Sequence, residues 1–149
     1  MLPEPQRLVA DDLFARFLSR VLQLDGFFPE FKAEHLSKIF PRSGIYAYPH
    51  GFHLVDQGDS GRDIFIIYTG AVEIRKSMGS AAAQLARLES GDIVGEIGLL
   101  RDGVRVATGV VLGEAQIFRL ASEDIAYLLQ NNPRLCEHLR RLAAQRLEG

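Results

Sequence analysis

A short stretch near residue 100 combines the residue types that a small anionic ligand needs. Gly95 permits a tight backbone turn, and residues 96–100 have room for about one turn of helix. The free N–H groups at the start of such a turn attract an anion. Glu96 can only accept hydrogen bonds, which suits a sugar hydroxyl, and the Arg105 guanidinium matches the oxygens of a phosphate. The sequence therefore predicts a site for a ligand with a hydroxyl and a phosphate, unless Glu96 and Arg105 only form a surface ion pair.

The other reactive side chains show no spacing that is typical of catalysis or of metal binding. The single cysteine, Cys136, excludes an intramolecular disulfide and is expected to pack near the apolar face of a helix. No GxxxxGKS/T loop is present that would hold a nucleoside triphosphate. The histidines form no HxH or HExxH motif, and they are His35, His50, His53 and His138. We therefore expect no enzyme, no metal site and no cofactor besides the ligand itself.

The composition is that of one globular domain. The chain has 149 residues, of which 47% are hydrophobic and 24% are charged. The formal net charge of −2 argues against a broad surface for nucleic acid. Residues 1–5 lack the features of a signal peptide, and no apolar run approaches the ~20 residues of a membrane span. We expect a cytoplasmic protein that binds no nucleic acid and has no membrane span.

Residues 1–7 are expected to form a loose lead-in, and residues 8–43 are predicted to be a helical segment. Apolar residues recur every three or four positions between residues 8 and 24, which indicates an amphipathic helix. Asp11 and Asp12 suit its first turn, and a shorter helix is expected at residues 32–39. The apolar stripe of the first helix consists of Val9, Leu13, Phe17, Val21 and Leu24. This helical segment, residues 8–43, either packs its stripe into the core or offers it to a partner.

Between residues 44 and 120 the pattern changes to short apolar or alternating runs separated by turn residues. Many short strands at such spacing predict an antiparallel sandwich or barrel. Gly58, Gly61 and Gly70 are expected to be turn residues rather than ligand contacts, and residues 68–71 predict a tight hairpin. The runs cover residues 45–48, 52–55, 63–68, 71–75, 84–88, 104–111 and 116–120.

The helical pattern returns over residues 121–148. Ser122 is a predicted N-cap, with Asp124 close behind it to complement the helix dipole. Pro133 follows two asparagines and is placed to open a second helix. The apolar stripe of that helix consists of Leu135, Leu139, Leu142 and Ala143.

Two ordered motifs resemble those of cyclic nucleotide-binding domains. Gly95-Glu96-Ile97-Gly98-Leu99 and Arg105-Val106-Ala107-Thr108 are similar to the two ends of the family's phosphate-binding cassette, and residues 57–72 resemble its turn-rich stretch and hairpin. The resemblance implies a single domain over residues 1–149 with a mainly β fold. An eight-stranded antiparallel jelly-roll β-barrel (a double-stranded β-helix) would occupy residues 44–120, with the cassette at 95–108, N-terminal helices before it and two C-terminal helices at 121–148.

The resemblance also implies a role for each cassette residue. The backbone amides of Ile97, Gly98 and Ala107, with the guanidinium of Arg105, would hold the cyclic phosphate. Glu96 would accept a hydrogen bond from the ribose 2′-OH. The remaining residues of the predicted binding set are Gly95, Leu99 and Val106.

Two positions depart from the family's pattern. Val104 stands where the family usually has proline, which removes some rigidity from the loop. Val106 follows the arginine, where relatives that favour cGMP usually carry a threonine or serine whose hydroxyl reaches the guanine. Because valine has no hydroxyl, the resemblance implies cAMP as the ligand and cGMP as the weaker one.

In the family, ligand binding shifts the C-terminal helices, which signal to a partner protein or to a fused effector. Leu135, Leu139 and Leu142 are therefore candidates for a lid over the base as well as for the core, and the helices are candidates for a homodimer interface. The chain ends at Gly149 without the helix-turn-helix of DNA-binding relatives, so it is not expected to bind an operator alone. The alternative is a degenerate jelly-roll module that no longer binds nucleotide and serves dimerisation or assembly.

Overall fold

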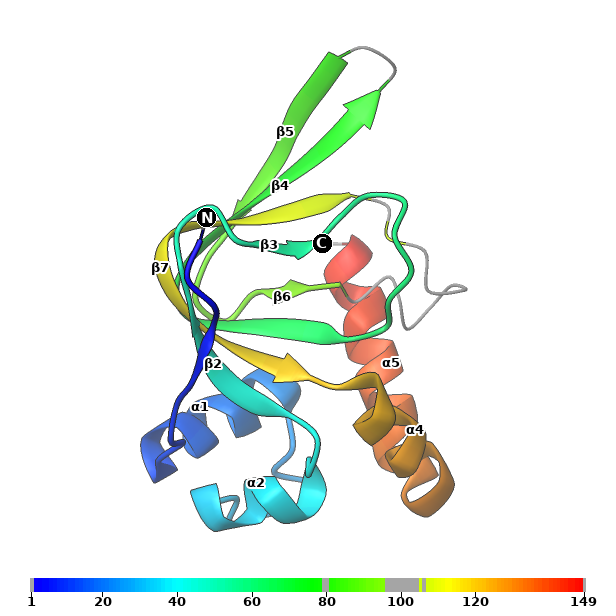
Figure 1. The fold of residues 1–149 in the computed structure, drawn as a ribbon. Helices are drawn as coiled ribbons and strands as arrows, with labels where there is room; N and C mark the ends of the chain where they lie inside the picture. Colours follow the sequence, from blue (N-terminus) through cyan, green and yellow to red (C-terminus); the bar gives the residue numbers. More distant parts are fainter. Residues whose placement is uncertain (1, 79–80, 96–104, 106, 149) are drawn as a thin grey trace.

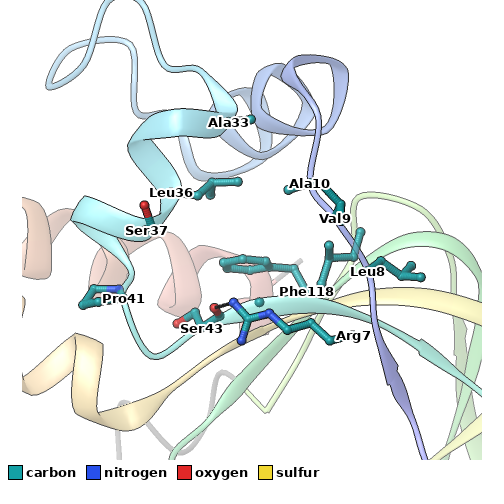
Figure 2. A pocket seen from close by; sticks show the side chains of 12 residues that line it. Arg7, Leu8, Val9, Ala10, Ala33, Leu36, Ser37, Pro41, Ser43 and Phe118 are labelled. Atoms are coloured by element: carbon teal, nitrogen blue, oxygen red, sulfur yellow. Dashed lines mark hydrogen bonds between the residues drawn. The ribbon is translucent and has the colours of Figure 1, made fainter.

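Helices at both ends of the chain flank an antiparallel sheet (Figure 1). The structure is a computed structural model that describes residues 2–78, 81–95, 105 and 107–148. None of the helices in this part of the chain has the length and apolar character needed to cross a membrane. In chain order the elements are β1 (Gln6–Arg7), α1 (Asp12–Leu22), α2 (Ala33–Ile39), β2 (Gly44–Tyr48), β3 (His53–Val55), β4 (Ile64–Met78), β5 (Ala81–Leu88), β6 (Ile93–Val94), β7 (Thr108–Leu120), α4 (Ser122–Asn131) and α5 (Pro133–Glu148). The predicted order of helices, strands and helices is confirmed.

Strand β7 is the centre of the sheet. The strand order is β1-β2-β7-β4-β5, while β3 also pairs with β7 and β6 also pairs with β4. All of these pairs are antiparallel. The described residues form seven strands, whereas eight were expected for the whole chain. Strands β1 and β6 have two residues each, and the sequence pattern did not indicate them, because two residues are too few to show an alternation of apolar and polar side chains.

The core consists of two apolar clusters on opposite faces of the strands. Phe65 and Ile67 of β4 belong to one cluster, whereas Ile64 and Ile66 belong to the other, as the alternation of a strand requires. The cluster that contains Ile64 and Ile66, called the helix cluster below, joins α1, α2, α4 and α5 to the sheet. The sheet cluster lies among the strands themselves, and its buried members are Tyr48, Val55, Phe65, Ile67, Val72, Val94, Val111, Ala115 and Ile117.

The predicted hairpin at residues 68–71 is wrong. Strand β4 runs without a break through this segment, and Gly70 lies at an irregularity in its pairing with β7. The partners step from Thr69 with Gln116 to Ala71 with Leu112, so β7 contributes extra residues opposite Gly70. Gly70 has a φ of +92°, which a bulge can require as well as a turn.

Helix α1 is shorter than predicted, and it buries a neighbouring face. Asp11 caps it by accepting a hydrogen bond from the Phe14 amide at 2.8 Å, so the residues before Asp12 lie outside the helix. Of the predicted stripe, Val9 is 98% exposed and Leu13 is 63% exposed, while Phe17 and Val21 are partly buried and Leu24 is fully buried. The buried residues within α1 are Phe14, Ala15, Leu18 and Leu22. The buried set is shifted by one residue from the predicted stripe, and packing against the rest of the fold determines which set is buried.

The C-terminal helices pack against the N-terminal ones. Pro133 begins α5 as predicted, and the Asn132 side chain accepts a hydrogen bond from the Leu135 amide at 3.2 Å. Ser122 is the first helical residue of α4 rather than its cap. His138 lies with its Nε2 2.7 Å from the Leu22 carbonyl oxygen, which joins α5 to α1. The three stripe leucines of α5 are all buried in the helix cluster, and they are Leu135, Leu139 and Leu142.

Truncation of Leu135 tests this core role. Leu135 is fully buried, so we expect Leu135→Ala to lower the free energy of unfolding of the ligand-free protein by about 2–5 kcal/mol. Leu13→Ala is the matched control, because the largely exposed Leu13 side chain should change stability by at most about 0.5 kcal/mol. Urea denaturation of both variants provides the measurement. Equal stabilities of the two variants would contradict the assignment of Leu135 to the core.

Candidate functional site

The backbone of Arg105 is fixed by a turn that lies far from it in the sequence. The Arg105 amide donates to the Asp59 carbonyl oxygen at 2.8 Å, and the Gly58 amide donates to the Arg105 carbonyl oxygen at 2.8 Å. Close by, the Gln57 amide donates to the Thr108 hydroxyl at 3.0 Å. The stretch from Gln57 to Asp59 therefore pairs with the residues that lead into β7, and this pairing aims Arg105 at a defined place.

The guanidinium of Arg105 is buried without a carboxylate at ion-pair distance among the described residues. Arg105 is only 8% exposed. Its Nη2 donates to the Asp63 carbonyl oxygen at 2.9 Å and its Nη1 to the Gly95 carbonyl oxygen at 3.3 Å. Burial lowers the pKa of Arg105, and the negative charge of Asp63 opposes this shift. The described residues thus give this buried cation hydrogen bonds to two neutral carbonyls and no direct carboxylate contact, an arrangement that favours an anion.

Two glycines let the backbone approach this guanidinium. A Cβ atom at Gly61 would lie 2.9 Å from Nη2 of Arg105, and a Cβ at Gly95 would lie 2.6 Å from Nη1. Gly95 also has a φ of +91°, which disfavours any side chain there. Gly61 was expected to be a turn residue only. Its close approach to Arg105 could not be predicted, because the two residues meet only in the folded chain.

Replacement of Gly61 tests whether the position of Arg105 matters. Gly61→Ala would push the guanidinium from its place, and we expect it to weaken binding of an anionic ligand by about tenfold, the effect of one lost or bent hydrogen bond to a charged group. Gly26→Ala is the control, because nothing lies within 4 Å of its Cβ. Calorimetric titration of both variants gives the comparison. Unchanged affinity in Gly61→Ala would show that the observed position of Arg105 is not the one that ligand binding uses.

The apolar sheet cluster adjoins this charge. Gly95 directly follows Val94, which is a buried member of the cluster. A Cβ atom added at Gly109 would lie 3.4 Å from the side chains of Val55 and Val94 and 3.5 Å from the side chain of Val72. Partly buried apolar side chains also pack on the cluster, and they are Tyr46, Phe52, Leu54, Ile74 and Leu88. A buried cation and the apolar sheet cluster therefore lie next to each other, a combination that suits an anion with an apolar body.

The structure places part of the predicted binding set. Gly95 and Arg105 are in contact, and the partly buried Ala107 lies two residues beyond Arg105. The remaining cassette predictions fall outside the described residues, and they are Glu96, Ile97, Gly98, Leu99 and Val106. The proposed lid residues of α5 lie in the helix cluster in this structure, and a lid role for them stays a prediction.

Comparison with known proteins identifies the family. The sequence matches the cyclic nucleotide-binding domain family over residues 46–132, which is more than half of the chain. The chain belongs to this family.

Two curated relatives of this cyclic nucleotide-binding domain have cyclic AMP in their names. The cyclic AMP receptor protein of Thermus thermophilus is 33% identical over 101 residues, which cover 67% of this chain and 47% of the relative. The cAMP-dependent protein kinase regulatory subunit of Mycosarcoma maydis is 31% identical over 108 residues, which cover 72% of this chain and 20% of the relative. The chain thus spans about half the length of the first relative and a fifth of the second.

A solved structure confirms the jelly-roll fold. A cyclic nucleotide-binding domain from Methylobacillus flagellatus superimposes with a TM-score of 0.77 and covers 98% of this chain and 85% of its own chain. Because the identity is 24%, this likeness concerns the fold. The sequence prediction of the family and of its fold class is confirmed.

Proposed function

We propose that this domain is a cAMP sensor. Cyclic AMP would place its phosphate on Arg105 and its base against apolar residues of the sheet. Binding would shift the equilibrium position of the C-terminal helices and so signal to a partner protein or to a fused effector. The helices are also the proposed surface for a homodimer, and no cofactor or metal takes part in the proposed binding.

The buried guanidinium of Arg105 is the observation that carries this proposal. A cyclic phosphodiester has one negative charge, so a single arginine with neighbouring backbone amides suffices to hold it. When the phosphate binds at Arg105, the guanidinium replaces part of the water around the phosphate. The attraction between the two charges is stronger at this buried position than at an exposed site, because less water and salt screen it.

Two observations favour cAMP over cGMP. Val106 follows the arginine and carries no hydroxyl that could bind the guanine base. Both curated relatives named above carry cAMP in their names. A single missing hydrogen bond amounts to about 0.5–1.5 kcal/mol, so we expect cAMP to bind up to about tenfold more tightly than cGMP.

Titration calorimetry with cAMP, cGMP and 5′-AMP tests the proposal. Saturable heat with cAMP, weaker binding of cGMP and the weakest binding of 5′-AMP are the expected results. The absence of heat with both cyclic nucleotides would reject the sensor function. If light scattering then gave a dimer whose mass is unchanged by nucleotide, the degenerate assembly module would be the better description.

A further inference from the structure

We propose that Asp63 is the coupling residue that transmits occupancy of Arg105 to the start of helix α4. This proposal rests on the proposed binding of a cyclic nucleotide at Arg105. It adds a specific route by which the site reaches the C-terminal helices, and it assigns that route to one residue between β-sheet and helix.

Asp63 contacts the binding arginine and the C-terminal helix at the same time. Its carbonyl oxygen accepts from Nη2 of Arg105 at 2.9 Å. Its carboxylate oxygen Oδ1 accepts from the Ser122 amide at 2.8 Å, while Oδ2 accepts from Nε of Arg119 at 2.8 Å. The path from Arg105 to α4 therefore passes through the main chain and the side chain of a single residue.

The contact with Ser122 is one that a helix start needs. Ser122 is the first residue of α4, and the first amides of a helix have no acceptor within the helix. A carboxylate at this end also complements the helix dipole. Asp63 thus supplies the cap of α4 from the segment before β4, a role that the sequence does not reveal because the two residues are 59 positions apart.

Arg119 holds the carboxylate in place. Its Nη2 lies 2.7 Å from Oδ2 of Asp63, and Arg119 of β7 pairs in register with Phe65 of β4. Partial burial lowers the pKa of Arg119, but the charge and the hydrogen bond of Asp63 outweigh this effect and raise it. The carboxylate therefore binds the sheet through Arg119 on one side and the first turn of α4 through Ser122 on the other.

A second carboxylate holds the same helix but does not contact Arg105. Asp124 is 1% exposed, and its two oxygens accept from the Arg42 amide at 3.1 Å each. It also accepts from the Ser43 hydroxyl, whose oxygen in turn accepts from the Ala121 amide at 2.9 Å. The first turn of α4 is thus anchored by two carboxylates, of which only Asp63 also contacts the proposed phosphate site. Asp124 had been expected only to complement the helix dipole.

A bound phosphate would change the Asp63 link. A charged phosphate oxygen is a stronger acceptor than a carbonyl oxygen, so the N–H groups of Arg105 would turn toward the ligand and weaken their bond to Asp63. The Asp63 backbone would then relax, and its carboxylate would change its hold on Ser122. Linkage makes the effect reciprocal, so a change at α4 also changes the affinity for the ligand.

The test compares Asp63→Ala with the matched control Asp124→Ala, because asparagine at position 63 would keep an oxygen that accepts from the Ser122 amide. Cyclic AMP affinity is measured by calorimetry, and amide hydrogen exchange of residues 123–125 is measured with and without cAMP. We expect Asp63→Ala to bind cAMP within about tenfold of the unchanged protein, because the carbonyl at position 63 remains, but to lose the cAMP-dependent change in exchange. Asp124→Ala should raise the basal exchange of these amides and keep its cAMP-dependent change.

A second variant breaks the same contact from the helix side. Ser122→Pro removes the donating amide at the first helical position, where proline is well tolerated, and should also abolish the cAMP-dependent change. A full cAMP-dependent change in both Asp63→Ala and Ser122→Pro would overturn the coupling role while leaving cAMP binding intact. Absence of cAMP binding by the unchanged protein would instead overturn the proposed function, and the coupling role with it.

Discussion

Replacing Arg105 with alanine is expected to weaken cAMP binding by roughly one to two orders of magnitude. A hydrogen bond to a charged group contributes about 1.5–3 kcal/mol, which corresponds to this loss in affinity. The effect should be the largest of any single replacement in the described part of the site, because Arg105 is its one buried cation. Calorimetric titration, with circular dichroism to verify the fold, provides the measurement.

Two further variants separate the geometry of Arg105 from its charge. Arg105→Lys keeps a positive charge but loses the planar fork that binds two oxygens, so it should recover only part of the affinity. Arg87→Ala removes an exposed arginine that pairs with Glu89, and it should leave the affinity unchanged. An affinity loss of the same size in Arg87→Ala would mean that only the total charge of the domain matters. Full binding by Arg105→Ala would show that the phosphate lies elsewhere.

The fold class could be predicted because it leaves local signals in the sequence, and part of the candidate site leaves such signals too. The change from a helical period to short alternating runs near residue 44 separates the helices from the sheet, and Pro133 marks the start of α5. Gly95 and Arg105 stand out because their residue types are those an anion requires. Their contact through the Gly95 carbonyl agrees with a shared site.

The features that could not be predicted depend on contacts between distant residues. Asp63 precedes an apolar strand and Asp124 lies in the first turn of a helix, so each has an ordinary local explanation. Only the folded chain brings Asp63 to Ser122 and Asp124 to Ser43. The same reason explains why α1 buries Phe14, Leu18 and Leu22 in addition to the later part of the predicted stripe, since packing against the sheet decides which apolar side chains are covered.

Gly70 lies in the segment where the predicted hairpin was wrong. Its replacement is expected to have the second large effect, in this case on the free energy of unfolding. A Cβ there would lie 2.7 Å from the Ala115 Cβ and 2.9 Å from the Glu114 carbonyl oxygen, in a backbone with a φ of +92°. Both the strained backbone and the overpacking cost about 1–3 kcal/mol each. We therefore expect Gly70→Ala to lower the free energy of unfolding by about 2–6 kcal/mol, as measured by urea denaturation.

Gly58 offers a control that isolates the steric part of this effect. Its φ of +89° is nearly the same as that of Gly70, yet nothing lies within 4 Å of its would-be Cβ. Gly58→Ala should therefore lower stability only by the backbone strain, about 1–3 kcal/mol. A larger loss in Gly70→Ala would support the bulge, in which the register step between β4 and β7 brings the Ala115 backbone against Gly70. Equal losses of stability in the two variants would mean that the β7 backbone can shift to accommodate a Cβ at position 70. The positive φ alone would then explain why a glycine is needed there.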